Sequence, residues 1–389
     1  MTNVRLPLEQ TCSHGADRRW RLGIGDDGTI VRLDPLDGST RAAAEDWQGD
    51  WISPMGVDLQ INGGLGLAFP ELTAADLPRV EQLLERLWDD GVEAIAPTLV
   101  TCAVEPLRQG LAVLAEARRR HRSGRCRLLG AHLEGPFLAP ERRGAHPSQH
   151  LATPNLEALE QRIGGFSGGP GWEEPADIAL MTLAPELEGS EAVIVALRRR
   201  GVVVSLGHSA ASEAQAQASF EVGVRMLTHC FNAMPDMHRR APGPVAAALL
   251  RSDVHLGLIA DGVHVAPTMA VLLQRLAPDR VVLVSDALAP YGLEDGIHRW
   301  DSRELHVKDG SCRLADGTLA GVTLPLLEGA VRLARWSGRP ERAIAAATVL
   351  PRRVLGDRRE LSRLLIGRPL HETLRWHQDQ AGLHWQRSG

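Results

Sequence analysis

The chain has 389 residues, enough for one large catalytic domain and a small accessory domain. Its hydrophobic share of 44% and charged share of 23% are ordinary for a globular protein and exclude a disordered chain. A net charge of −5 offers no basic surface to a polyanion, so we expect no nucleic-acid partner. Lys308 is the only lysine, which excludes Schiff-base, pyridoxal-phosphate and Walker-type sites over the first 307 residues.

Cysteine usage and hydropathy bear on the compartment. The five cysteines are scattered without a CxxC pair, which argues against a zinc ribbon and a disulfide framework. The N-terminal residues hold no apolar core of signal-peptide length, and no run of about 18 uncharged apolar residues occurs. We therefore expect a soluble cytoplasmic protein that has no membrane partner.

The N-terminal region predicts a small β unit. Residues 21–35 (RLGIGDDGTIVRLDP) read as a hairpin of two alternating strands around an Asp-Gly turn. Residues 308–310 (KDG) are a second hairpin turn. We expect residues 1–53 to pair with residues near 302–315 in a small, sandwich-like β domain.

The region from 54 to 350 alternates short apolar runs with amphipathic stretches, which is typical of parallel βα units. The predicted strands are 55–62, 92–100, 127–134, 178–186, 202–208, 224–230, 255–261 and 280–286, with helices at 76–91, 191–201 and 266–278 among those between them. Eight such units predict a (β/α)8 TIM barrel with a possible β insertion near 302–315. Residues 351–389 are weakly patterned and are expected to return to the small domain.

Polar residues stand where the predicted strands end, the face that carries catalysis in such barrels. They are Gln60 and Asn62 on the first strand, Glu134 on the third, His208 on the fifth, His229 on the sixth, Asp261 and His264 after the seventh, and Asp286 on the eighth. The opposite face of the barrel is expected to serve stability.

Two imidazoles and a carboxylate are a common catalytic zinc set. Glu134, His208 and His229 supply it. A lone strand-end histidine is more often an ordinary polar residue, but three ligand types on one face favour a metal site. Asp286 is the candidate general base and acid. Its alternative role, a helix N-cap, is disfavoured because the following ALAPYG does not look like a helix start.

Ten motifs in the same order resemble the N-acetylglucosamine-6-phosphate deacetylase family of the amidohydrolase superfamily, over residues 53–350. They are SPMGVDLQINGGLG (53–66), PTLVT (97–101), AHLEGPFL (131–138), RRGAHP (142–147), TLAPE (182–186), SLGHS (205–209), THCFNAMP (228–235), IADGVHV (259–265), VSDALAP (284–290) and DGTLAG (316–321).

The resemblance implies a role for each matching residue. Glu134, His208 and His229 match the metal ligands, Asp286 the catalytic acid/base, and His146 the group that polarises the acetyl carbonyl. Asn232, Ala233 and His264 match positions that hold the sugar and its 6-phosphate, and we add Gln60, Asn62 and Gly135 to the substrate-binding set. Arg240 matches an arginine that reaches the phosphate of the neighbouring subunit, which implies a homodimer.

The first strand departs from the wider superfamily. An H-x-H pair usually stands there and helps to bind a second metal, whereas this chain has Gln60 and Asn62. Amides are weak zinc ligands and no barrel lysine is available for carbamylation. We therefore predict one divalent ion per subunit, with zinc preferred over iron or cobalt.

These observations predict hydrolysis of N-acetylglucosamine 6-phosphate to glucosamine 6-phosphate and acetate. Two alternatives stay open at this stage. One is a related amidohydrolase that acts on another N-acyl amino sugar or a cyclic amide. The other is a catalytically retired barrel that binds a sugar phosphate.

Overall fold

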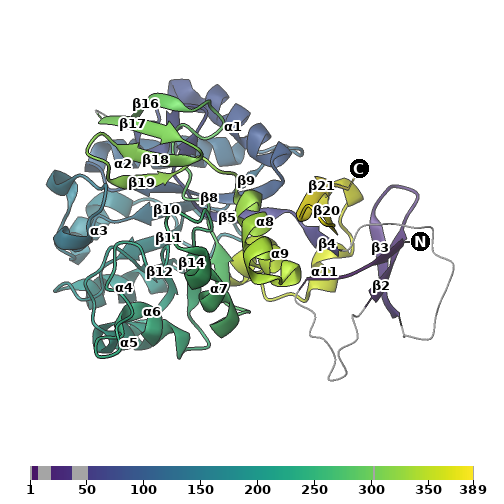
Figure 1. Cartoon of the computed structure of the whole chain (residues 1–389). Coiled ribbons are helices and arrows are strands. Elements are labelled where there is room, and N and C mark those ends of the chain that lie inside the picture. Colours follow the sequence, from purple (N-terminus) through teal and green to yellow (C-terminus); the bar gives the residue numbers. More distant parts are fainter. Residues whose placement is uncertain (1, 8–18, 37–50, 301–302, 389) are drawn as a thin grey trace.

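A computed structural model describes residues 2–7, 19–36, 51–300 and 303–388 (Figure 1). Its centre is a nearly closed barrel of eight parallel strands in the order β15-β14-β13-β12-β11-β10-β8-β5. These are β5 (Gly56–Ile61), β8 (Val92–Val100), β10 (Ala131–Glu134), β11 (Ile178–Leu183), β12 (Val203–Leu206), β13 (Val224–Leu227), β14 (His255–Leu258) and β15 (Val281–Leu283). The short β9 (Arg127–Leu128) pairs with β8. The predicted (β/α)8 barrel is confirmed.

Two backbone hydrogen bonds join the first and last strands at the carboxyl end of the barrel. The N–H of Asp286 donates to the carbonyl of Gln60 at 2.8 Å, and that of Asn62 donates to the carbonyl of Ala287 at 2.7 Å. They bring the polar ends of β5 and β15 side by side.

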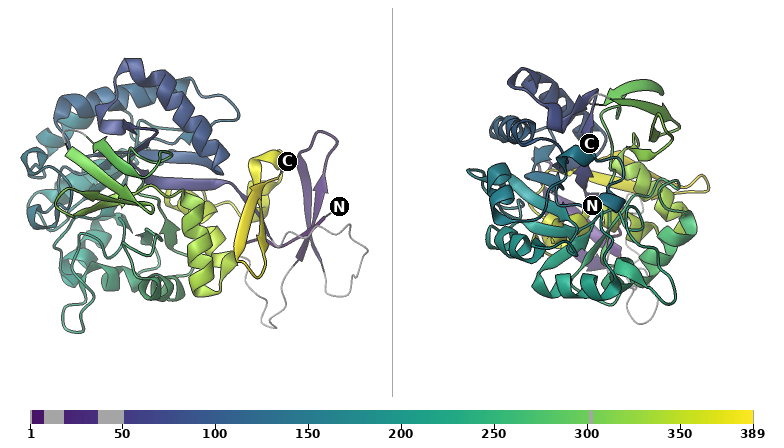
Figure 2. Two further views of the ribbon diagram at one scale, coloured as in Figure 1. Left: turned by 45° about the horizontal axis from the view of Figure 1, so that its top comes forward. Right: turned by 90° about the vertical axis from the view of Figure 1, so that its left-hand side faces the viewer.

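Helices surround the strands (Figure 2). They are α1 (Leu77–Asp89), α2 (Val104–Arg119), α3 (Leu156–Ile163), α4 (Ser190–Arg199), α5 (Glu213–Val222), α6 (Gly243–Leu249), α7 (Pro267–Leu276), α8 (Leu326–Ser337), α9 (Pro340–Thr348) and α10 (Leu350–Val354). The predicted helices at 76–91, 191–201 and 266–278 correspond to α1, α4 and α7. No helix of the described residues is long and apolar enough to cross a bilayer.

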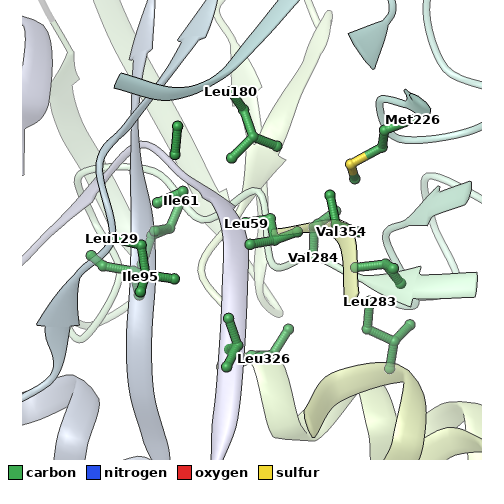
Figure 3. Close-up of a cluster of buried hydrophobic side chains, with 14 of the residues drawn as sticks. Leu59, Ile61, Ile95, Leu129, Leu180, Met226, Leu283, Val284, Leu326 and Val354 are labelled. Carbon is green, nitrogen blue, oxygen red and sulfur yellow. The ribbon is translucent and has the colours of Figure 1, made fainter. Parts of the chain in front are cut away.

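Strand β5 shows how alternation divides core from site. Leu59 and Ile61 are buried in the main hydrophobic core, whose other members include Leu326 of α8 and Val354 of α10 (Figure 3). Because successive side chains of a strand point to opposite faces, residues 58, 60 and 62 face the other way. That face carries Gln60 and Asn62 to the mouth of the barrel.

An antiparallel sheet follows the last barrel strand. It contains β16 (Gly296–Trp300), β17 (Arg303–Lys308), β18 (Ser311–Leu314) and β19 (Leu319–Val322). The N–H of Leu288 donates to the carbonyl of Val322 at 2.9 Å, so β19 is attached to the chain just after β15. The predicted pairing of residues 1–53 with 302–315 is therefore wrong for the described residues. The alternating pattern correctly indicated strands there, but alternation does not specify a partner.

The two ends of the chain form two antiparallel sheets, and the second of these joins strands from both ends. One holds β1 (Thr2–Val4), β2 (Arg19–Ile24) and β3 (Ile30–Leu36), which confirms the 21–35 hairpin, and the other holds β4 (Trp51–Pro54), β20 (Thr373–Gln378) and β21 (Leu383–Arg387). Apolar side chains from β2 and β3 share a buried cluster with α11 (Leu361–Leu365). The contacts agree with an accessory domain made by the termini, while the boundaries at 53 and 350 remain predictions.

Candidate metal centre and active-site pocket

A cavity of about 280 Å³ opens at the carboxyl ends of the barrel strands. Nine of the twelve predicted site residues line it: Asn62, Glu134, His146, His208, His229, Asn232, Ala233, His264 and Asp286. Gln60, Gly135 and Arg240 are not among its lining residues. Leu288, Trp300, Leu319 and Ala320 also line it, so the β16–β19 sheet forms part of its wall.

Three of the predicted site residues have a left-handed backbone conformation, which residues other than glycine seldom adopt. His208, His229 and Asp286 have φ of 49°, 28° and 51°, and each follows a barrel strand by two or three residues. The left-handed region costs a non-glycine residue on the order of 1–2 kcal/mol. The surrounding structure therefore holds these residues in a geometry that the chain alone would not choose.

The donor atoms of Glu134, His208 and His229 are close together and mutually equidistant. Glu134 Oε1 lies 3.2 Å from the Nε2 atoms of His208 and His229, and these two nitrogens lie 3.1 Å apart. Tetrahedral ligands at zinc bond lengths would be about 3.3 Å apart. The three residues therefore have the spacing and the donor chemistry to hold one divalent ion.

A second grouping includes His146, since one ligand atom each of Glu134, His146 and His208 lie within 4.8 Å of one another. Hydrogen bonds distinguish the two histidines. Nδ1 of His208 lies 2.9 Å from the carbonyl of Arg142, which can only accept a hydrogen bond. A neutral His208 therefore carries its proton on Nδ1 and has a free lone pair on Nε2. Nδ1 of His146 accepts the N–H of Thr101 at 3.3 Å, so a neutral His146 carries its proton on Nε2. His208 thus presents a ligand to the cavity, whereas His146 presents a donor.

Burial and neighbouring groups shift the pKa values of these side chains. Burial, with the nearby His208, lowers the pKa of His146 to about 3 and keeps its ring neutral. Burial acts to raise the pKa of Glu134, but the adjacent imidazoles of His208 and His229 hold it well below its usual range. Burial, reinforced by the charge of Glu134, raises the pKa of Asp286 to about 6. Asp286 is therefore suited to exchange a proton near neutral pH.

The amide side chains of the first strand tie both carboxylates together. Nε2 of Gln60 donates to Glu134 Oε1 at 2.9 Å and to Asp286 Oδ1 at 3.2 Å, and Nδ2 of Asn62 donates to Asp286 Oδ1 at 2.8 Å. Gln60 thus orients the site from outside the cavity. No partner among the described residues reaches Gln60 Oε1, Asn62 Oδ1 or His229 Nδ1, all of which are buried.

No family model matches the chain, but curated relatives and solved structures do. The N-acetylglucosamine-6-phosphate deacetylase of Vibrio furnissii is 31% identical over 366 residues, covering 92% of this chain and 88% of the relative. The human enzyme of that name is 36% identical over 323 residues, covering 80% and 76%. The chain belongs to the N-acetylglucosamine-6-phosphate deacetylase family.

Two further comparisons extend the relationship. The N-acetylgalactosamine-6-phosphate deacetylase of Escherichia coli O157:H7 is 32% identical over 332 residues, covering 85% of this chain and 84% of the relative. A Mycobacterium smegmatis deacetylase structure in complex with N-acetyl-D-glucosamine-6-phosphate superposes with a TM-score of 0.80 at 27% identity, covering all of this chain and 98% of that one. The sequence motifs and the architecture of the whole chain therefore both indicate the same family.

The remaining predicted residues occupy different surroundings. His264 Nδ1 lies 2.7 Å from Asp261 Oδ2, which orients the ring at the edge of the cavity. Gly135 serves the backbone, because it has a φ of 90° and a Cβ there would lie 2.1 Å from Thr101 Oγ1. Arg240 is exposed on the segment before α6 and is not among the residues that line the cavity.

Sequence reasoning missed Glu186, which supports the turn that carries His208. Its carboxylate accepts the hydroxyl of Ser209 at 2.7 Å and the N–H of Ala210 at 2.5 Å. Glu186 closes the predicted strand 178–186, so the strand-end rule could have found it. Trp300 was also missed, and no local signal in the sequence distinguishes it from an ordinary core residue.

Proposed function

We propose that the protein hydrolyses N-acetylglucosamine 6-phosphate to glucosamine 6-phosphate and acetate. The observation that carries the proposal is that two histidines in one cavity have opposite partners at Nδ1, a carbonyl for His208 and a backbone N–H for His146. His208 presents a lone pair beside Glu134 and His229, while His146 presents an N–H. A hydrolase that attacks an amide needs both an electrophilic centre and a donor to the carbonyl oxygen.

The roles of the side chains follow from this geometry. Glu134, His208 and His229 would hold one divalent ion, for which we propose zinc. When bound, such an ion supplies Lewis acidity and lowers the pKa of a coordinated water. His146 donates to the acetyl oxygen. Asp286, fixed by Gln60 and Asn62 through Oδ1, accepts a proton from the attacking water and returns it to the departing nitrogen.

The sugar phosphate would lie toward Asn232, Ala233 and His264. We propose that Arg240 of a second subunit completes the phosphate site in a homodimer. Its exposure, and that of Met237 on the same segment at 39%, supports a surface available to a second copy. A cytoplasmic location also remains a proposal, supported by four described cysteines that are free thiols.

Acetate release by the zinc-loaded protein tests the activity. We expect turnover of N-acetylglucosamine 6-phosphate above that of the 6-phosphate of N-acetylgalactosamine, and little turnover of unphosphorylated N-acetylglucosamine. Protein with a stoichiometric metal that releases acetate from neither phosphate would contradict the proposal. Metal analysis of the purified protein tests the choice of zinc.

Subunit mixing tests the role of Arg240. Arg240→Ala is expected to raise KM for the phosphorylated substrate about tenfold, whereas Arg239→Ala, its exposed neighbour, is the control. Mixed dimers of Arg240→Ala with Asp286→Asn should regain the low KM, because one site then has both intact residues. If mixing restores nothing, Arg240 does not act across a subunit interface.

A further inference from the structure

A second cavity of about 470 Å³ lies behind the wall that carries His146. Thr101, Cys102, Arg143, Arg303 and Leu314 are among its lining residues. Val100 and Trp300 line both this cavity and the active-site cavity. These two side chains, which we name the partition, therefore separate the two spaces.

The backbone part of the wall is fixed by arginines. Arg143 donates to the carbonyl of His146 at 2.9 Å, and Arg303 donates to the carbonyl of Ala145 at 2.5 Å. The Arg303 guanidinium also lies 4.3 Å from the centroid of the Trp300 ring, and Trp300 is only 5% exposed. Both the 145–146 backbone and the indole ring are thus held in place, so the partition is a defined boundary.

Val100 occupies a particular position in this boundary. It is the register partner of Glu134 in the parallel pair of β8 and β10. The next residue, Thr101, donates its N–H to His146 Nδ1. Val100 therefore lies beside Glu134, which would hold the metal, and directly precedes the residue that bonds His146. Because Val100 lines the same cavity as Glu134 and His146, we infer that an acyl group bound there places its alkyl substituent against Val100.

We propose that the partition of Val100 and Trp300 sets the length of the acyl group that the enzyme removes, and that the second cavity is acyl-chain space closed off by it. The inference rests on the proposed function and specifies its substrate class. With the partition intact, the enzyme accepts acetyl and rejects chains of three or four carbons. With Val100 shortened, the longer chain passes into the second cavity.

The test compares N-formyl, N-acetyl, N-propanoyl and N-butanoyl glucosamine 6-phosphate by kcat/KM. In the wild type we expect a steep fall beyond acetyl, since one methylene in a fitted pocket changes rates by about 10–200-fold. Val100→Ala should raise the butanoyl-to-acetyl ratio about tenfold or more. Val100→Leu should shift the preference the other way, raising the formyl-to-acetyl ratio. Unchanged ratios in both variants would overturn the inference.

Leu314 supplies a matched control because it lines only the second cavity. Leu314→Trp alone should leave the acyl preference unchanged. Added to Val100→Ala, it should cancel the butanoyl gain by filling the newly accessible space. A gain that persists in the double variant would show that the longer chain goes elsewhere and would overturn the role of the second cavity.

Failure of this inference and failure of the proposed function give different results. If every variant releases acetate with one common acyl preference, the deacetylase assignment stands and only the partition is wrong. If the wild type hydrolyses none of the four substrates, the deacetylase assignment and the partition both fall.

Discussion

The two ends of the barrel hold buried charges in different ways. At the mouth, the carboxylates of Glu134 and Asp286 lie among the imidazoles of His146, His208 and His229 and accept hydrogen bonds from the amides of Gln60 and Asn62. At the floor, Glu93 near the start of β8 forms ion pairs with both Arg352 and Arg368. Arg352 is fully buried, donates to the carbonyl of Met55 at 3.0 Å and lies over the ring of Trp172.

The difference separates function from stability. At the floor, burial acts to raise the pKa of Glu93, but the two guanidinium groups hold it below its usual range, so its charge is matched within the chain. At the mouth, burial raises the pKa of Asp286, and the Nε2 atoms of His208 and His229 lie 3.1 Å apart beside Glu134 without an arginine partner for the carboxylate among the contacts described above. The mouth therefore has donor atoms arranged to hold a cation, whereas at the floor the arginines already compensate the carboxylate.

Asp286→Asn should have the largest effect on activity, and that effect should be limited to the chemistry at the mouth of the barrel. Asparagine keeps the size of the side chain but cannot take a proton, so kcat should fall about 10³-fold, within the range of about 10²–10⁴ for general acid–base groups. Chemical unfolding should show no loss of stability, because removing one carboxylate relieves repulsion with Glu134. A variant with near wild-type kcat would assign proton transfer to another group.

Arg352→Ala should lower the stability of the protein and leave its activity nearly unchanged. Removing one partner leaves Glu93 buried with less compensation, which costs about 3–5 kcal/mol of unfolding free energy. Urea unfolding measures this loss, while metal content per folded chain and kcat should stay close to wild type. The double change Glu93→Gln with Arg352→Met should recover much of the stability. If a substitution at Glu93 or Arg352 lowered the metal content without lowering stability, the two ends of the barrel would not have separate roles.

Asp58 lies between the two ends, on the same strand face as Gln60. Burial raises its pKa to about 7, and Asp286 adds to the shift. Below about pH 4 the folded and unfolded carboxyls are both protonated, and its contribution to stability is complete. As the pH rises toward 7 only the unfolded form ionises, so stability falls by at most about 4 kcal/mol.

Asp58→Asn removes this pH dependence while an amide oxygen still accepts the N–H groups of Gln60 and Ser285. Urea unfolding at pH 5 and pH 8 should show the variant gaining on the wild type at the higher pH. The exposed Asp236→Asn serves as the control. Equal stability differences at both pH values would show that Asp58 is already ionised in the folded protein.

Glu186→Gln should have the smallest effect. The change weakens the bonds to Ser209 and Ala210, so the turn that carries His208 is held less firmly. Outer partners of ligands typically contribute about 10–100-fold in metal affinity, and we expect the lower value. A competitive chelator titration measures it, with the exposed Glu188→Gln as control. Unchanged affinity would mean that strand β12 and the carbonyl of Arg142 position His208 without help from Glu186.

Local pattern in the sequence was enough for the barrel. Each predicted strand overlaps an observed one, because alternation and helical periodicity depend on nearby residues. The rule that catalytic groups stand at strand ends also predicted that Glu134, His208, His229 and Asp286 lie together, and all four line one cavity. The rule works because the carboxyl ends of parallel strands share one edge of the sheet.

Only the tertiary structure decided how these residues act. The tautomers of His146 and His208 are fixed by Thr101 and the carbonyl of Arg142, which lie 45 and 66 residues away. The partner of the 303–314 strands, the Glu93 ion pairs and the partition of Val100 and Trp300 likewise depend on long-range packing. Periodicity specifies which face of an element is buried, but which distant side chain meets it is set by closure of the whole barrel.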